Sequence, residues 1–298
     1  QEYYRNTRAM LNSFYKTGTF TIDSLTGTVN QLEGRLSFID QIDHYNNLRN
    51  GAQKSLNARE KQYRNFLFYK HFYFTERPVI VTEGKTDARY IKAALKKYYT
   101  EYPELIKKDK NGGFEYKVSF FKRTDKTSYI FGMAKDGADS MRQIYNFYSG
   151  KGGLPNLYRY FNEICEKPAQ HPVILLFDNE MISGTKKPLK KFLRNLDGSR
   201  GEEIKVALKE KQNALLVRDS NLYLMTIPLV KSKAECEIED LFGDDVLGTI
   251  IGGKTFSASG NFDEKLHYGK DIFSKFILNN YEEIEMENFK MLLNTMVS

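Results

Sequence analysis

Two short runs of consecutive apolar residues constrain the fold of this chain most strongly. Residues 79–81 read VIV and residues 173–177 read VILLF. Uninterrupted apolar runs of this length are typical of strands that are covered on both faces, as in a parallel sheet. Helical patterns lie between and around them, so the sequence predicts an α/β fold with a mostly parallel sheet between helices.

The rest of the chain is consistent with this alternation. Pro78 cannot lie inside a helix, so it marks the end of a helical N-terminal region. Residues 101–113 contain Pro103 and the letters DKNGG, which predict a loop. Further strands are expected at 114–121, 214–218 and 222–227, and helices at 88–98, 138–148, 156–166 and from Asp271 onward.

The first 75 residues differ in composition from the rest. They carry ten Lys and Arg against six Asp and Glu, together with 14 Phe and Tyr, and helices are expected at 3–16, 25–39 and 56–74. Basic residues mixed with flat rings suit a nucleic-acid surface, where charge meets phosphate and rings stack on bases. Rings in a core with solvated charges are the alternative. The predicted domains are residues 1–75 and residues 76–298.

Composition narrows the class of protein. The net charge is +7, from 45 Lys and Arg against 38 Asp and Glu. No apolar run approaches the roughly 20 residues that a membrane helix needs, so no membrane partner is expected. The two cysteines, Cys165 and Cys236, provide no disulfide framework, which favours the cytoplasm. Whether the chain forms a homo-oligomer is left open.

Acidic residues follow both apolar runs. Glu83 comes two residues after the first, and Asp178 directly after the second, with Glu180 two positions on. Ligands of open α/β sheets bind beyond the carboxyl ends of parallel strands, so we expect these acids to meet at one edge. Carboxylates that repel one another are relieved by a hard divalent cation, with Mg²⁺ favoured and Mn²⁺ a second candidate. Asp87 would cap the following helix or hold a metal-bound water.

These residues resemble a known domain. VIVTEGKTD followed by VILLFDNE is similar to the TOPRIM domain of topoisomerases, primases and overcoming-lysogenization-defect-type nucleases. The resemblance implies a Rossmann-like, mostly parallel sheet, with Glu83 as the family's glutamate and Asp178 and Glu180 as its metal-binding pair. The sequence departs from the family at two positions: Glu180 replaces an aspartate, and Ile182 stands where a further acid is often found. The second departure bears against a two-metal site.

A later acidic run, AECEIEDLF at 234–242, is similar to the segment that the overcoming-lysogenization-defect-type nucleases add to their site. The run is expected at the start of a helix. Within it, Glu239 and Asp240 are the preferred additional metal ligands, and a solvated helix face is the alternative. Lys270 is the candidate for stabilising charge on the scissile phosphate, as a lysine does in related nucleases.

The segment that follows the Asp178 motif is strongly basic, and a substrate backbone entering the site would meet it. Its candidate nucleic-acid contacts are Lys186, Lys187, Lys190, Lys191 and Arg194, and an ordinary solvated helix is the alternative. By contrast, the letters GTIIGGKT at 248–255 match a phosphate-binding loop only in form. Such a loop needs a strand before it and a helix after it, and neither is expected here.

The N-terminal quarter carries a second resemblance. YRNTRAMLNSFYKTG and LEGRLSFIDQI are similar to the thumb-like end of retron reverse transcriptases, some of which continue into a TOPRIM domain. Because the chain opens at Gln1, it is expected to be the C-terminal part of such a fusion, whose parent would be an RNA-directed DNA polymerase. The implied partners are retron RNA and its linked DNA.

The sequence therefore predicts a Mg²⁺-dependent nuclease, with Glu83, Asp178, Glu180 and Lys270 as catalytic residues. Glu83 is alternatively a general acid or base. The resemblance implies a toxic effector in anti-phage defence, restrained by the reverse transcriptase. Two alternatives stay open: a nucleic-acid-binding module with a vestigial site, and primase-like nucleotidyl transfer.

Overall fold

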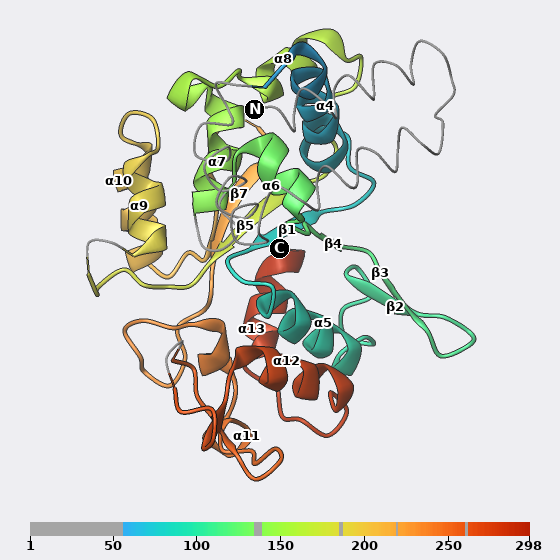
Figure 1. Ribbon diagram of the computed structural model, residues 1–298, viewed down its shortest axis with the longest axis vertical. Coiled ribbons are helices and arrows are strands. Elements are labelled where there is room, and N and C mark those ends of the chain that lie inside the picture. The colour runs from blue at the N-terminus through green and yellow to red at the C-terminus, as the bar shows by residue number, and fades with distance from the viewer. Residues whose placement is uncertain (1–55, 134–138, 185–186, 219, 260–261) are drawn as a thin grey trace, which may run out of the picture. The chain divides into compact units, whose positions relative to one another are not determined.

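The computed structural model describes residues 56–133, 139–184, 187–218, 220–259 and 262–298 (Figure 1). A five-stranded sheet has the order β4-β1-β5-β7-β6, and only β6 runs antiparallel to its neighbour. The predicted α/β class with a mostly parallel sheet is confirmed, and the arrangement is compatible with a Rossmann-like fold. The strands are β1 (Val79–Thr82), β4 (Ser119–Phe120), β5 (Val173–Phe177), β6 (Ala214–Leu216) and β7 (Leu222–Thr226).

The two apolar runs form the centre of this sheet. Every residue of β1 and β5 is buried, as their continuous apolar sequences predicted. The strands pair in parallel, with Thr82 opposite Leu176. Because the strands run in the same direction and pair residue by residue from Val79 opposite Val173, both end at the same edge of the sheet.

Helices cover both faces (Figure 1). One face packs Val81, Leu175 and Leu224 against a large helical layer. This layer contains α4 (Ala58–Phe68), the π-helix η1 (Tyr69–Tyr73), α6 (Asp125–Phe131), α7 (Asp139–Ser149), α8 (Leu157–Ile164), α9 (Pro188–Arg194) and α10 (Arg200–Lys209). The other face packs Ile80 and Leu176 against α5 (Asp87–Lys97), α12 (Lys270–Asn279) and α13 (Phe289–Val297).

The predictions for 101–121 are wrong in detail. Residues 106–108 are not loop but β2 (Ile106–Lys108), which pairs antiparallel with β3 (Phe114–Tyr116). The single strand expected at 114–121 is divided, because the chain changes partners. The Lys117 amide donates to the Leu105 carbonyl at 2.8 Å, whereas the Ser119 amide donates to the Pro78 carbonyl at 2.8 Å.

Short elements complete the C-terminal half: η2 (Lys151–Gly153), η3 (Ile238–Leu241), α11 (Asp244–Leu247), β8 (Thr255–Phe256) and β9 (His267–Tyr268). The helix expected near the acidic run is thus a single 3₁₀ turn, η3. Residues 248–255 follow the short helix α11 and lead into β8. The surroundings that a phosphate-binding loop needs are missing there, as the sequence predicted.

The predicted helices at 3–16 and 25–39 lie outside the described residues. The third, expected at 56–74, is confirmed as α4 and η1, and its Phe68 and Phe72 are buried in the core that covers β1 and β5. Residues 56–298 form one compact unit. No helix within the described ranges combines the length and apolarity required to cross a membrane.

The central position of β5 gives a stability prediction. Leu175 is fully buried, so Leu175→Ala should lower the free energy of unfolding by roughly 2–5 kcal/mol through lost burial and a cavity. Ile250→Ala is the control, since Ile250 is 68% exposed and its truncation should change stability by less than about 0.5 kcal/mol. Urea denaturation measures the free energy of unfolding of both variants. Equal losses in Leu175→Ala and Ile250→Ala would contradict the buried position of Leu175.

Candidate active site

Glu83 and Asp178 meet at the carboxyl edge of the sheet. Each follows the end of one of the two central strands, and the backbone amide of Asp178 donates to Glu83 Oε1 at 3.1 Å. Both side chains are partly buried. The two strand tips that the sequence singled out are therefore in direct contact.

The loop after Glu83 is fixed by Asp87, the first residue of α5. Asp87 Oδ2 accepts from the Gly84 amide at 2.8 Å, and Oδ1 accepts from the Thr86 hydroxyl at 3.2 Å. A Cβ on residue 84 would lie 3.1 Å from Asp87 Oδ1, a tight contact that a larger residue could make only if the Asp87 carboxylate shifted. Asp87 thus positions the loop that carries Glu83.

An arginine that the sequence analysis did not single out lies at the same edge. Arg123 follows β4, the neighbour of β1, and its guanidinium donates to the carbonyls of Thr82, at 3.2 Å, and Glu83. It also donates to Ser140 Oγ at 2.8 Å. A positive charge therefore lies directly behind the Glu83 loop.

A two-residue bridge brings the later acidic run to this edge. The Asn179 amide donates to the Cys236 carbonyl at 2.8 Å, and the Cys236 amide returns a bond to the Asn179 carbonyl at 3.1 Å. The buried Asn179 side chain donates to the Ile227 carbonyl at 3.2 Å. Residues 235–239 are thereby held beside the tip of β5.

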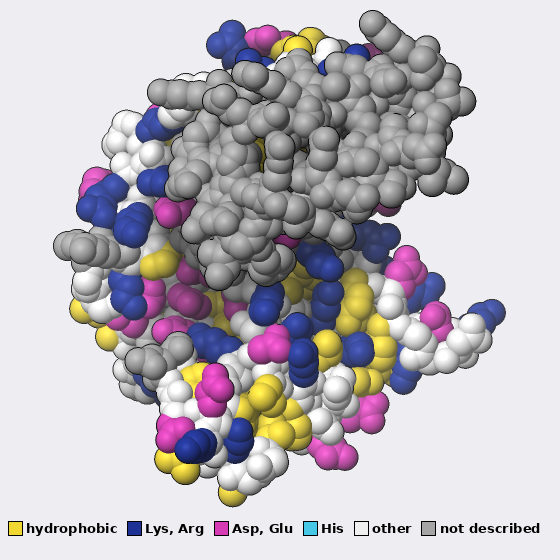
Figure 2. Space-filling view, in the orientation of Figure 1, with side chains coloured by type: hydrophobic (Ala, Val, Ile, Leu, Met, Phe, Trp, Pro, Cys, Tyr) yellow, Lys and Arg dark blue, Asp and Glu magenta, His cyan; other side chains and the backbone are white. Residues whose placement is uncertain are grey.

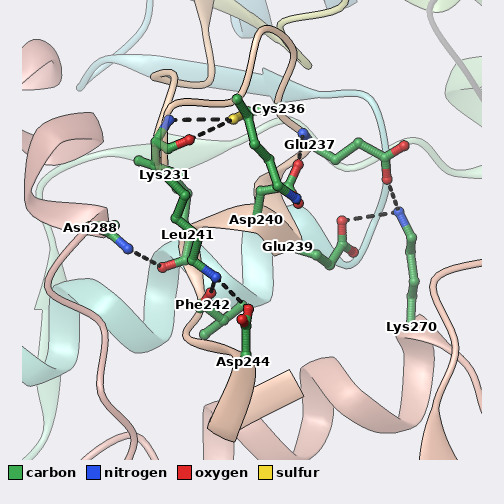
Figure 3. A network of polar contacts seen from close by, with 12 residues as sticks. Lys231, Cys236, Glu237, Glu239, Asp240, Leu241, Phe242, Asp244, Lys270 and Asn288 are labelled. Carbon is green, nitrogen blue, oxygen red and sulfur yellow. Dashed lines mark hydrogen bonds and ion pairs between the residues drawn. The ribbon is translucent and has the colours of Figure 1, made fainter. Parts of the chain in front are cut away.

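Two glutamates of that run share Lys270 (Figure 3). Lys270 Nζ lies 3.1 Å from Glu237 Oε2 and 3.0 Å from Glu239 Oε2. Burial acts to lower the pKa of Lys270, but the two carboxylates outweigh it and raise that pKa. Glu239 is buried, and its Oε1 has no hydrogen-bond partner among the described residues.

Glu237, rather than Asp240, accompanies Glu239. The Asp240 carboxylate accepts from the Glu237 amide at 2.8 Å and pairs with Lys233 at 2.5 Å, so it caps the 3₁₀ turn. The Glu239 side chain points to Lys270, whereas that of Asp240 points back to the Glu237 amide. The sequence offered one usable signal, the alternation of acids at 235, 237 and 239.

Glu180 and the basic segment are linked to each other. Glu180 is buried and forms an ion pair with Lys187, while Lys190 donates to the carbonyls of Ile182 and Ser183, each at 2.9 Å. Two predicted phosphate contacts thus stabilise the loop after β5. The remaining candidates are Lys191 and Arg194, which are exposed on α9, and Lys186, which lies outside the described residues.

Burial and mutual repulsion make it costly to ionise all the acids at this edge of the sheet. Burial, followed by the charges of Asp87, Glu180 and Glu237, raises the pKa of Glu83 to about 7 even though the Asp178 amide opposes this. Burial and then Glu83 raise the pKa of Asp178 well above its usual range. Burial likewise raises the pKa values of Asp87 and Glu239.

The donor set fits a divalent cation. Carboxylate oxygens are the ligands that Mg²⁺ prefers, and Glu239 Oε1 is a buried acceptor without a partner in the described part of the chain. As placed, no three acidic, His or Cys side chains of the described residues converge on one ion position. Glu180, Glu237 and Glu239 bond to lysines instead, so binding an ion requires some of them to turn.

No family model matches the chain, and no solved structure matches it.

The raised pKa of Glu83 predicts a pH-dependent stability. Unfolded Glu83 releases its proton near pH 4.5 and folded Glu83 near pH 7, so the folded state binds more protons within this window. Stability should therefore fall as pH rises from about 5 to 8. Glu83→Gln removes this titration and should be stabilised relative to wild type at pH 8 by on the order of 2 kcal/mol.

Urea denaturation at pH 5 and pH 8 in EDTA measures this difference. Glu115→Gln, at an exposed glutamate on β3, is the matched control and should follow wild type at both values. A Glu83→Gln variant whose stability falls with pH as steeply as that of wild type would contradict the site electrostatics.

Proposed function

We propose that this chain is a metal-dependent phosphodiesterase acting on nucleic acid, with residues 76–298 forming a TOPRIM domain. The observation that carries the proposal is the contact between Glu83 and Asp178 at the tips of two buried parallel strands. Their raised pKa values support it, because strongly perturbed carboxylates gathered at a sheet edge are typical of catalytic sites.

Asp178 and Glu83 would hold the ion, with Glu180, Glu237 and Glu239 as further oxygen ligands once they leave their lysines. Mg²⁺, or Mn²⁺ in its place, supplies positive charge that polarises a phosphate and lowers the pKa of an attacking water. The structure favours Glu237 over Asp240 in this set, because Asp240 caps the 3₁₀ turn. Asp87 keeps its role in the Glu83 loop.

Two side chains have further chemical roles in this proposal. A carboxyl whose pKa is about 7 exchanges its proton near neutral pH, so Glu83 suits a general acid or base. Glu237 and Glu239 raise the pKa of Lys270. Once these carboxylates turn toward the ion, the Lys270 charge would stabilise the developing negative charge on the phosphate.

We also propose that the chain is the C-terminal part of a retron reverse transcriptase fusion, and that the nuclease is its toxic anti-phage effector in the cytoplasm. In this proposal the thumb-like region binds retron RNA and its linked DNA, and the reverse transcriptase restrains the nuclease. The support is the sequence likeness of the N-terminal quarter.

Cleavage assays test the nuclease. The purified chain is incubated with labelled single-stranded DNA, duplex DNA, RNA and tRNA, in Mg²⁺ and in EDTA. Cleavage should require Mg²⁺, and Glu83→Gln and Asp178→Asn should each lower its rate roughly 100-fold or more, because several kcal/mol of transition-state stabilisation are lost. Asp244→Asn is the matched control, since Asp244 is exposed and pairs with Lys231.

The other outcomes are equally informative. Cleavage that survives both substitutions would show that a different site is responsible. Binding without cleavage of any substrate would favour a non-catalytic module, and incorporation of nucleoside triphosphates would favour primase-like transfer.

A further inference from the structure

A group of lysines without an acidic partner in the described part of the chain lies on and beside α5. Lys92 and Lys96 are one helical turn apart on α5, Lys108 ends β2, and Lys122 follows β4. We call these four residues the lysine strip. None of the four is ion-paired with another described residue, whereas the nearby Arg89 pairs with Asp271 at 2.8 Å.

The lysine strip alternates with partly exposed aromatic rings. Lys92 Nζ lies 5.7 Å from the Tyr116 ring centre and 5.1 Å from that of Phe120. Lys96 lies 5.7 Å from Phe114 and 5.1 Å from Tyr281. Figure 2 shows Lys and Arg side chains interspersed with hydrophobic ones over α5 and the hairpin β2–β3.

Lys108 continues the pattern across the hairpin, at 5.3 Å from the Tyr99 ring centre and 5.5 Å from that of Phe114. Tyr99 and Phe114 contact each other edge to face, with ring centres 5.6 Å apart. The antiparallel register places Lys108 opposite Phe114, so both belong to one face of the hairpin.

Like charges are crowded in the lysine strip. Burial, followed by the charges of Lys122 and Lys96, lowers the pKa of Lys92. Unrelieved repulsion of this kind is removed by a polyanion that bridges the cations. The rings favour a nucleic acid, because every unpaired base offers a flat face that stacks on an aromatic side chain, whereas the Asp and Glu side chains of an acidic peptide offer none.

The helix that carries Lys92 and Lys96 begins near the acidic site. Helix α5 begins at Asp87, just after Glu83, and Lys122 follows β4, which pairs with β1. The eleven residues of α5 extend about 16 Å away from that edge. A strand lying on the lysine strip would therefore lead its phosphates toward Glu83 and Asp178.

We propose that the lysine strip and its rings bind single-stranded nucleic acid and deliver it to the carboxylate site. This inference rests on the proposed function and adds the path of its substrate. Bases stack on Phe114, Tyr116 and Phe120 in place of the lysine ammonium groups, because base stacking is stronger than an exposed cation–π contact. The freed lysines bind the phosphates. This interface is separate from the basic segment around α9, where Lys187 and Lys190 bind groups of the protein itself.

Fluorescence anisotropy of labelled single-stranded DNA and RNA, in EDTA so that turnover is absent, tests the lysine strip. At 0.1 M salt, Lys92→Ala/Lys96→Ala should bind roughly 10- to 30-fold more weakly than wild type. Its salt dependence should be shallower by about 1.4 in the slope of log K against log salt. The control Lys209→Ala/Lys265→Ala removes two exposed lysines elsewhere and should match wild type.

A second variant reports on stacking. The chain has no tryptophan, so Phe120→Trp introduces a single indole, whose fluorescence should be quenched by an oligonucleotide and unchanged by poly-glutamate. Lys92→Arg/Lys96→Arg keeps the charges and should keep binding, which separates loss of the interface from misfolding of the alanine variant. Circular dichroism melting checks that each variant is folded.

Three results are decisive. Binding by the alanine variant that equals the control would overturn the lysine strip. Poly-glutamate that competes as well as an oligonucleotide would assign the surface to an acidic protein and overturn the nucleic-acid inference. Strip-dependent binding without cleavage of any substrate would support the lysine strip and refute the nuclease, so the two proposals fail separately.

Discussion

The carboxylate site depends on the parallel pairing of β1 with β5. Both strands are buried throughout, and their register brings Glu83 and Asp178 together in partly buried surroundings. Charges separated from water are costly to ionise, and neighbouring carboxylates raise that cost. The site is therefore a position where the fold gives up stability, which is common where chemistry or binding requires it.

Three local devices keep this arrangement in place. Asp87 fixes the Gly84 turn, Arg123 binds the carbonyls at the end of β1, and the Asn179–Cys236 bridge attaches the later acidic run to β5. Lys270 balances part of the negative charge. The same lysine holds Glu237 and Glu239 away from the other acids, so a bound cation and Lys270 would compete for these carboxylates.

The sequence predicted the parts of the structure that depend on local pattern. Continuous apolar runs identified β1 and β5. The acids that follow these runs were expected at one edge of the sheet, and Glu83 and Asp178 lie there, because strand direction decides where such residues are placed. Asp240 and Lys190 show the limit of this reasoning: their roles depend on which atoms lie within hydrogen-bonding distance, and spacing does not contain that information. The division of the expected strand 114–121 into β3 and β4 likewise depends on the partners that the chain finds on either side of Lys117. Predictions for the N-terminal region fall largely outside the described residues and stay predictions.

The central claim is that Glu83 and Asp178 act on one cation. A double-mutant cycle on Mn²⁺ affinity, measured by calorimetry with wild type, Glu83→Gln, Asp178→Asn and the double variant, tests this directly. If both acids hold one ion, the double variant should lose little more affinity than either single variant. Losses that add independently, or an affinity that neither substitution changes, would contradict the shared site.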